Sequence, residues 1–245
     1  PPIVNQLGAL SSTQIQSLRL DQVSSLTAEQ INQFTTDQIN ALIPNQLKSI
    51  NTGNIGSMTT SQLQSLGAIK FTQLTTAQLL ALRTDQVNSL SSSQISGLSA
   101  AQLQAFNTSQ IQAITTQGIS AISTANIGLM RKEQIAALTY ATDSNSGLSQ
   151  INALSIEQAK ALNGVQVAGM STAAIAAMRD SQIQALGASV IVAMTTDQVN
   201  RLRTGQVAAL STIQLQAMEA RDVASLTTEA VNALTAAQVS VLSPA

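Results

Sequence analysis

A short polar segment in the middle of the chain has the side chains of a possible calcium loop. Asp143, Asn145 and Gly147 stand at alternate positions of residues 143–147, which is how such a loop begins. A calcium loop also needs an acidic ligand further on, and residues 148–151 supply none. Calcium is therefore not expected here, and we interpret the segment as a surface loop.

The neighbourhood of this loop is nevertheless the best candidate for a local binding spot. Tyr140 is the only tyrosine and is expected to point outward beside the loop, a few residues after Arg131 and Lys132. Aromatic and cationic side chains are the usual anchors of protein interfaces. If one spot on this chain contacts a protein or a glycan, we predict that it contains Tyr140, Asp143, Asn145, Arg131 and Lys132.

Catalytic and cofactor chemistry is not predicted. The chain has no His and no Cys, which removes the usual zinc sites and the Ser-His-Asp and Cys-His nucleophiles. The carboxylates are dispersed, and most of them, like Asp37 and Asp197, are placed where a short helix would begin and its dipole would favour them. We expect no cofactor, no metal and no enzymatic activity.

Composition also excludes several kinds of partner. Charged residues make up 9% of the chain and the net charge is −1, with no basic run, so nucleic acid is not an expected partner. The longest strongly apolar stretch, residues 190–194, is far shorter than the ~20 residues that cross a bilayer. No membrane span is therefore predicted.

An eight-residue repeat, here called the octad, organises the whole sequence. Counting in eights from Gln6 to Gln238 gives 30 octads without insertion or deletion, and 21 of them have Gln at this position, the Gln position. The next residue, the first apolar position, is Ile, Val, Leu or Phe in every octad except at Asp143 and Ala159. The second apolar position, three residues later, is Leu, Ile, Met or Phe in every octad except at Ser146.

The octad predicts a helix that is broken in every unit. Two apolar residues three apart share one helix face, but a continuous helix would turn that face by about 80° per octad. The residue after the second apolar position, the cap position, is Ser or Thr in 17 octads, and the Gln three residues later completes a capping box. The predicted capping residues include the following: Thr35, Thr195, Gln14, Gln38, Gln62, Gln86 and Gln198.

Sorting the octads by type indicates a longer period of 24 residues. Every third octad, from Gln14 through Gln206, keeps Gln, and the larger side chains such as Phe34, Met58 and Phe106 gather in one other class. We therefore predict an all-α solenoid of short-helix octads, with three octads per coil and about ten coils. The chain is expected to be one domain, 1–245, with a divergent loop at 139–149.

The octads resemble repeat arrays of very large bacterial proteins. Residues 84–87 and 195–199 carry the L-T-T-x-Q-[V/I]-x-A-L pattern that is similar to arrays in adhesin-like and haem-utilisation-like surface or secreted proteins. This resemblance implies an extracellular or cell-surface spacer or fibre-forming segment. It implies no haem chemistry, because the chain lacks a cluster of His, Cys or Tyr for an axial ligand.

Two kinds of function follow from the sequence. The first is structural: a stalk, spacer or filament segment whose apolar pattern runs from Leu7 to Leu242, so that it continues a longer array or associates end to end with copies of itself. The second is an adhesive solenoid that binds a protein or glycan near Tyr140. An ice-binding face made of paired threonines is less favoured, because the first threonine of each pair is used as a helix cap.

Overall fold

The computed structural model describes residues 4–138 and 151–242. These residues are helical wherever they are regular, and within these two ranges there is no β-strand. The all-α fold predicted from the octad is confirmed. The chain forms two compact units, Pro1–Ile122 and Ser123–Ala245, and each is described by itself below.

The first unit opens with a 3-10 helix and continues with fourteen short α-helices. Their bounds are η1 Val4–Ala9, α1 Ser12–Gln16, α2 Leu20–Ser24, α3 Ala28–Asn32, α4 Thr36–Ala41, α5 Pro44–Ser49, α6 Thr52–Ser57, α7 Thr60–Ser65, α8 Gly67–Phe71, α9 Thr76–Leu80, α10 Thr84–Asn88, α11 Ser92–Ser96, α12 Ala100–Ala105, α13 Thr108–Ala113 and α14 Thr116–Ala121.

The second unit repeats the same kind of helix. The bounds are α15 Thr124–Leu129, α16 Lys132–Ala137, α18 Ile156–Lys160, α19 Gly164–Ala168, α20 Thr172–Ala177, α21 Asp180–Ala185, α22 Ala188–Val192, α23 Thr196–Asn200, α24 Thr204–Ala208, α25 Thr212–Ala217, α26 Ala220–Ala224, α27 Thr228–Asn232 and α28 Ala236–Val239. The divergent loop expected at 139–149 lies outside the described residues.

Each α-helix that the structure describes, apart from α8, begins directly after an extended residue at the cap position. Thr59, for example, is extended at φ −72° and ψ 157°, and its hydroxyl accepts a hydrogen bond from the backbone of Gln62. The helix then ends about one turn later at the second apolar position. Because isolated helices this short are unstable in water, their stability must come from packing against other helices.

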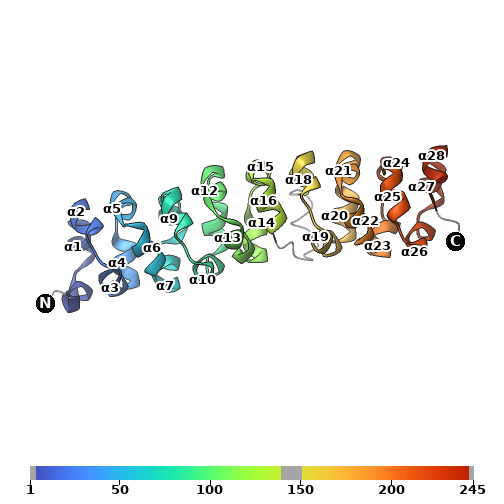
Figure 1. The fold of residues 1–245 in the computed structure, drawn as a ribbon. Coiled ribbons are helices and arrows are strands. Elements are labelled where there is room, and N and C mark those ends of the chain that lie inside the picture. The colour runs from blue at the N-terminus through green and yellow to red at the C-terminus, as the bar shows by residue number, and fades with distance from the viewer. Residues whose placement is uncertain (1–3, 139–150, 243–245) are drawn as a thin grey trace. The chain divides into compact units, whose positions relative to one another are not determined.

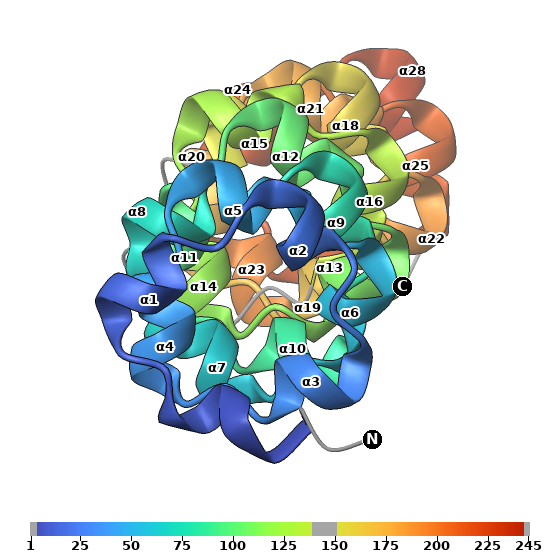
Figure 2. The same ribbon diagram turned by 90° about the vertical axis from the view of Figure 1, so that its left-hand side faces the viewer.

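Helices three octads apart pack on one another within each unit. In the first unit α1 contacts α4, α4 contacts α7 and α10 contacts α13; in the second α18 contacts α21 and α24 contacts α27. Figure 1 shows such neighbours, for example α2 and α5. In Figure 2 the helices α1, α2 and α3 lie on three different sides of the first unit. The prediction of three octads per coil is therefore confirmed.

The two apolar positions of the octad form the core of both units. The first apolar position is fully buried at Ile31 and Ile183, and the second is nearly so at Leu90 and Leu186. The aromatic side chains Phe34, Phe71 and Phe106 are likewise at most 3% exposed, so they fill the interior and offer no outer stacking surface.

The octad of α8 shows how the fold tolerates a departure from the pattern. Gly67 replaces the usual Ser or Thr at the cap position and adopts φ +60°, a left-handed conformation that glycine reaches at little cost. Lys70 then stands at the Gln position while Phe71 keeps the buried apolar position. The ammonium group of Lys70 donates to the carbonyl oxygen of Asn40, 30 residues earlier, so this octad keeps a bond to the preceding coil as well as its apolar pattern.

Candidate functional site

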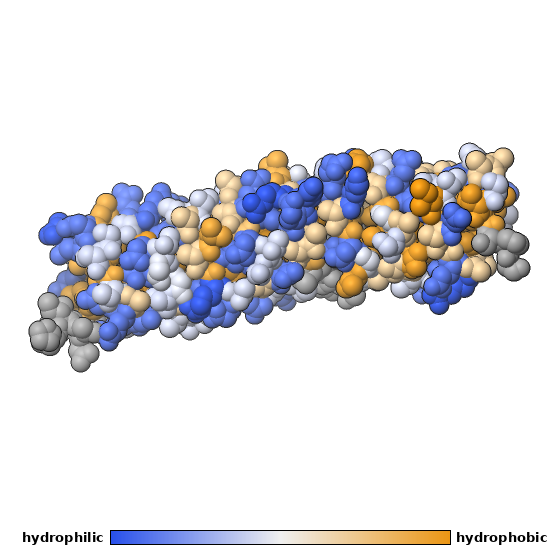
Figure 3. Space-filling view, in the orientation of Figure 1, coloured by the Kyte–Doolittle hydropathy of each residue, from blue (hydrophilic) through white to orange (hydrophobic). Residues whose placement is uncertain are grey.

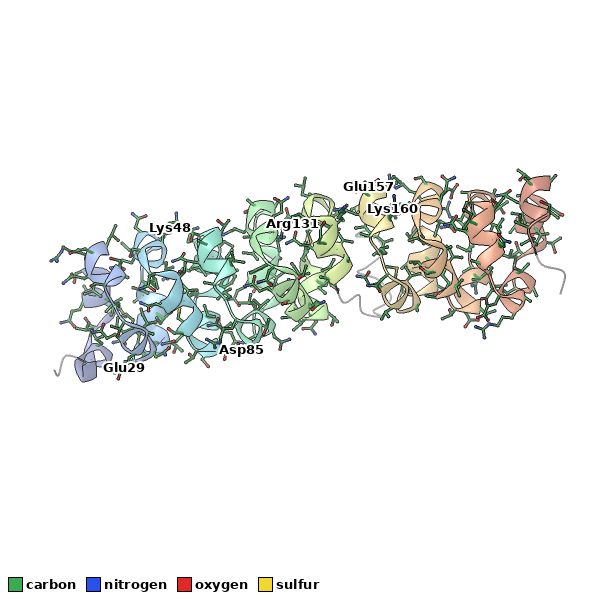
Figure 4. All side chains as sticks on the ribbon, viewed as in Figure 1. Glu29, Lys48, Asp85, Arg131, Glu157 and Lys160 are labelled. Carbon is green, nitrogen blue, oxygen red and sulfur yellow. The ribbon has the colours of Figure 1, made fainter. Side chains whose placement is uncertain are left out.

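The charged side chains that the structure describes are dispersed, and they form no cluster that could hold a metal ion. Within residues 4–138 and 151–242, no group of three or more Asp, Glu, His or Cys side chains could hold a metal ion. Figure 4 shows Glu29, Lys48 and Asp85 of the first unit on separate helices and on the outside. Over the same part of the chain no helix is long and apolar enough to cross a bilayer.

The binding spot predicted around Tyr140 is only partly described. Tyr140, Asp143 and Asn145 lie outside the described residues. Arg131 precedes α16 at the cap position, and its backbone N–H donates to the side-chain oxygen of Gln134 at 3.1 Å. Arg131 and Lys132 are exposed at the start of α16. The grouping of these five residues stays a prediction.

The most regular polar constellation of the molecule is centred on the Gln position. At Gln62 the backbone N–H donates to the Thr59 hydroxyl at 3.2 Å, and the side-chain oxygen accepts from the Thr59 backbone N–H at 2.9 Å. Thr35 with Gln38 and Thr195 with Gln198 make the same pair of bonds. In each pair, the two bonds satisfy backbone N–H groups at the start of the helix that have no acceptor within the helix.

The other end of the Gln side chain joins one coil to the previous one. Nε2 of Gln62 donates to the carbonyl oxygens of Ile31 at 2.9 Å and Phe34 at 2.8 Å. Ile31 lies in the last turn of α3 and Phe34 in the link to α4, the helix on which α7 packs. The Gln therefore lies over the corner between two helices of the preceding coil.

These coil-bridging bonds recur through both units. In each case Nε2 donates to at least one carbonyl 28 to 31 residues earlier, at the same places of the octad. The glutamines that do so are Gln38, Gln46, Gln62, Gln78, Gln86, Gln94, Gln102, Gln110, Gln158, Gln166, Gln182, Gln198, Gln206, Gln214 and Gln238.

Burial gives these amides their energetic weight. Gln46, Gln86 and Gln206 are 0% exposed, so an unpaired amide at any of them would cost about 1–3 kcal/mol. The oxygen and the nitrogen of each amide are instead both bonded, one within its own octad and one to the preceding coil. The most frequent polar residue of the sequence is therefore engaged inside the fold.

Arginines at the cap position make a second kind of coil-bridging contact. Arg203 has no side-chain oxygen and cannot cap its helix, but its guanidinium donates to the carbonyls of Ala176 and Met178 at 2.9 and 2.7 Å. Arg179 reaches the carbonyl of Leu154 at 2.7 Å. These carbonyls lie at the end of a helix in the preceding coil, where a cation is favoured, and those of Met178 and Leu154 also accept from Gln206 and Gln182.

Exposed amides two residues after the Gln position add a third kind. Gln64 donates to the carbonyl of Ser89 at 2.7 Å, and Asn200 donates to the carbonyl of Ser225 at 2.7 Å. In both cases the acceptor stands 25 residues later, in the following coil. Outward polar side chains thus also hold neighbouring coils together.

Two exposed ion pairs lower the pKa of their aspartate side chains. The guanidinium of Arg83 donates to both carboxylate oxygens of Asp85 at 3.0 Å, and this hydrogen bond lowers the pKa of that carboxyl. Arg19 lowers the pKa of Asp21 in the same way. Both pairs join two exposed residues of one octad at the start of a helix. They are therefore local surface contacts.

The outer surface of the first unit carries one hollow that residues of two helices line. This hollow is shallow and open, and it lies between α1 and α4. It is lined by Ser12, Gln16, Asp37, Asn40 and Ala41. On the face drawn in Figure 3, hydrophilic and hydrophobic residues alternate over short distances.

Reasoning from the sequence missed the coil-bridging bonds, although a signal for them was present. A capping box needs only a side-chain oxygen at its third helical residue, which Glu supplies as well as Gln. The Gln position nevertheless contains no Glu in any of the 30 octads. The preference for an amide indicates that its N–H group is used, and the structure shows where that group donates.

One stretch of the second unit matches a known family. Residues 181–212 match the model of the ALTTAQ repeat. This stretch runs from α21 to the start of α25 and contains the octads of Gln182, Gln198 and Gln206, together with that of Val190. The match supports assignment of this stretch to a repeat family.

Comparisons of the whole chain add little. No curated protein matches the sequence. Among solved structures, the chain is similar to the leucine-rich repeat-containing protein LegL7 from Legionella pneumophila, with 11% identity over 94% of this chain and 88% of that chain. The TM-score is 0.27, so this likeness carries no argument about fold or function.

Proposed function

We propose that this chain is a structural spacer, a repeat segment that sets a length within a bacterial cell-surface or secreted protein. The observation that carries the proposal is the use of its repeated polar residues. The Ser and Thr caps and the glutamines are bonded within and between coils, as at Gln62 and Gln198. A binding site would need to present such polar side chains to a partner, but here they form hydrogen bonds within the fold.

The remaining surface supports the same proposal. Ion pairs such as Arg19 with Asp21 and Arg83 with Asp85 are exposed and local, and they contribute little to stability or recognition. We assign the chain no catalytic role, because it has no His or Cys and its described residues hold no group of three or more carboxylates. The placement outside the cell rests on the resemblance of its octads to arrays of surface and secreted proteins.

A spacer made of equal coils has a length that depends only on their number. Stability in such a solenoid is the sum of coil terms and contacts between neighbours, so removing one whole coil leaves the rest intact. Deletion of residues 59–82 removes three octads and joins Met58 to Arg83, a cap residue, in unbroken register. We expect the shortened chain to keep its helix content per residue and to have a smaller radius of gyration in small-angle X-ray scattering.

A deletion of unequal length is the matched control. Removal of residues 59–78 takes out 20 residues, so the later octads lose their register with the preceding coils. This variant should lose helix content and melt at a lower temperature. The spacer proposal is wrong if the 24-residue deletion is as damaging as the 20-residue one, or if it leaves the radius of gyration unchanged.

A further inference from the structure

The hollow on the first unit is lined by polar side chains that the fold leaves unbonded. It lies between α1 and α4, which pack side by side (Figure 2), and it has a volume of about 370 Å³. Ser12, Gln16, Asp37 and Asn40 supply its polar lining, and Ala41 is the fifth lining residue. The four polar side chains are exposed, and they make no hydrogen bond within the described residues.

The equivalent place between α7 and α10 shows why this hollow stays open. There the Gln64 side chain crosses to the next coil, where its Nε2 donates to the carbonyl of Ser89 at 2.7 Å. Gln16 and Ala41 stand at the same places of their octads, but within the described part of the chain the Gln16 amide makes no such bond. An amide that elsewhere closes the space between two coils is therefore free to contact a ligand here.

The carboxylate beside this amide is free as well. Asp85, at the matching place in α10, is held by two hydrogen bonds of 3.0 Å from the Arg83 guanidinium. Asp37 follows Thr35 at the cap position instead of an arginine, and its octad contains no cation to pair with it. The hollow thus combines an unpaired carboxylate with two unbonded amides and a hydroxyl, an arrangement that the space between α7 and α10 lacks.

These four groups are complementary to the hydroxyls of a sugar ring. A carboxylate only accepts hydrogen bonds, an amide both donates and accepts, and a hydroxyl does either, which matches a ligand whose adjacent hydroxyls each donate and accept. Small-molecule sites usually have ~300–1,000 Å³, so a hollow of about 370 Å³ has room for one ring rather than for an extended ligand. Ala41 adds a small apolar contact for the C–H groups of the ring.

Other classes of ligand are less complementary to the hollow. Its lining has no aromatic side chain and no arginine, which are the usual anchors of a protein partner. An acidic ligand would meet the Asp37 carboxylate, and Lys70, whose ammonium donates to the backbone carbonyl of Asn40, is not among the lining residues. A metal ion or a simple amine would engage the single carboxylate and leave both amides without a partner.

We propose that the hollow between α1 and α4 binds one neutral hexose residue of a glycan. Asp37 accepts hydrogen bonds from two adjacent hydroxyls of the ring, while the amides of Gln16 and Asn40 and the hydroxyl of Ser12 bond the others. Because the hollow is open, the rest of the glycan continues into solvent. This binding role goes beyond the spacer function and does not depend on it, since a segment that sets a length can carry a binding site on its outside.

Titration with simple glycosides tests the proposal. A methyl hexoside has the substituted anomeric oxygen of a glycan residue, so the nitrogen-labelled chain is titrated with the methyl glycosides of glucose, galactose and mannose, one at a time. With at least one of them, the NMR signals of the Gln16 and Asn40 side-chain amides should shift until they saturate, whereas those of Gln64 and Asn88 should not. The dissociation constant should be about millimolar, because a small and open contact provides little free energy for each ligand atom.

Variants test the polar groups one by one. Asp37→Asn removes the charge at nearly unchanged size and Asn40→Leu removes the amide, and each should weaken binding about tenfold with unchanged circular dichroism. Asp85→Asn and Asn88→Leu make the same changes at the matching places of α10 and should leave binding unchanged. The uronic acid that corresponds to the bound hexoside adds a carboxylate to the same ring, so it should bind more weakly.

Two results would overturn the proposal. One is that none of the three hexosides shifts the Gln16 and Asn40 signals at concentrations far above the millimolar range. The other is that the Asp37→Asn and Asn40→Leu variants bind as tightly as their controls in α10. Deletion of residues 59–82 removes no lining residue, so the shortened chain should keep the site. A failed sugar titration and a failed length test are therefore separate results, and the first leaves the spacer proposal standing.

Discussion

The octads of Gln86 and Asp222 have the same kind of helix but different connections to the preceding coil. Gln86 in α10 bonds the backbone of Arg83 and the carbonyls of Ile55 and Met58. Asp222 in α26 is 2% exposed, yet a carboxylate cannot donate to the equivalent carbonyls of Ile191 and Met194. Its Oδ1 instead accepts from the Thr196 hydroxyl at 2.7 Å.

The next octad of the second unit differs in the same way. Ala230 stands at the Gln position, is 1% exposed and has no side-chain amide to offer the carbonyls of Val199 and Leu202. Nevertheless α26 packs on α23, and α27 packs on α24. The comparison teaches that the apolar positions are sufficient to stack the coils, while the glutamines add polar bonds that fix one coil to the next.

The largest expected effect comes from removing a coil-bridging amide in a region that has one. Gln86→Leu leaves the N–H of Arg83 and the carbonyls of Ile55 and Met58 without their bonds, at a cost of about 1–3 kcal/mol for a buried group left unsatisfied. The midpoint of urea unfolding, followed by circular dichroism, should fall accordingly. Gln112→Leu makes the same chemical change at an exposed position and should shift the midpoint little. Equal shifts would show that the coil-bridging bonds contribute nothing.

A smaller effect of opposite sign is expected where the amide is missing. Asp222→Gln supplies a donor for Ile191 and Met194 and an acceptor for the backbone of Glu219, so it should raise stability by about 0.5–1.5 kcal/mol, the net value of a hydrogen bond. Hydrogen exchange of the α26 amides should slow. Glu229→Gln, which removes a negative charge from an exposed neighbour, is the control and should leave exchange unchanged. Faster exchange in Asp222→Gln would mean that the Thr196 bond outweighs the missing amide.

The smallest effect concerns pH at the helix of Gln86. Its neighbour Asp85 has a pKa lowered by the hydrogen bond from Arg83, so the folded carboxyl holds its proton less tightly than the unfolded one. The pair therefore stabilises the fold above the ordinary Asp pKa of about 3.9, and this contribution is lost as the pH falls through the lower, folded value. Melting temperatures should drop slightly more with acid in the unmodified chain than in Asp85→Asn.

Exposure keeps that last effect small. The side chains of Arg83 and Asp85 are 47% and 60% exposed, so solvent and salt screen the pair. Asp37→Asn is a suitable control, since Asp37 makes no ion pair within the described residues. If Asp85→Asn and Asp37→Asn change the acid dependence equally, the Arg83 contact has no effect on stability.

Much of this fold could be predicted from local chemistry. Thr35 and Gln38 are three residues apart at a break in the apolar pattern, and that spacing alone indicates a capping box. The burial of Leu90 and Leu186 follows from the period of the apolar positions. The 24-residue coil could also be found, because octads that share a side of the coil share residue preferences.

The coil-bridging contacts could not be placed in the same way. The carbonyls of Ile31 and Phe34 lie 31 and 28 residues before Gln62, and nothing local to Gln62 specifies them. Arg203 is a poor cap by residue type, so its role emerges only once the preceding coil lies beside it. The candidate spot at Tyr140 depends on residues in the divergent octad, where the pattern that guides the other predictions is lost.

The constant offset of the coil-bridging bonds has a consequence for the gene. Each coil-bridging Gln donates to backbone carbonyls of the octad four units earlier. Since every octad has such carbonyls, one octad can replace another as the partner. Duplication or loss of a DNA segment that encodes whole octads therefore yields a chain in which nearly every amide again meets two carbonyls. A change by any other in-frame length misaligns every coil that crosses it. Selection on such a gene can adjust the length of its product in eight-residue steps without inventing a new contact.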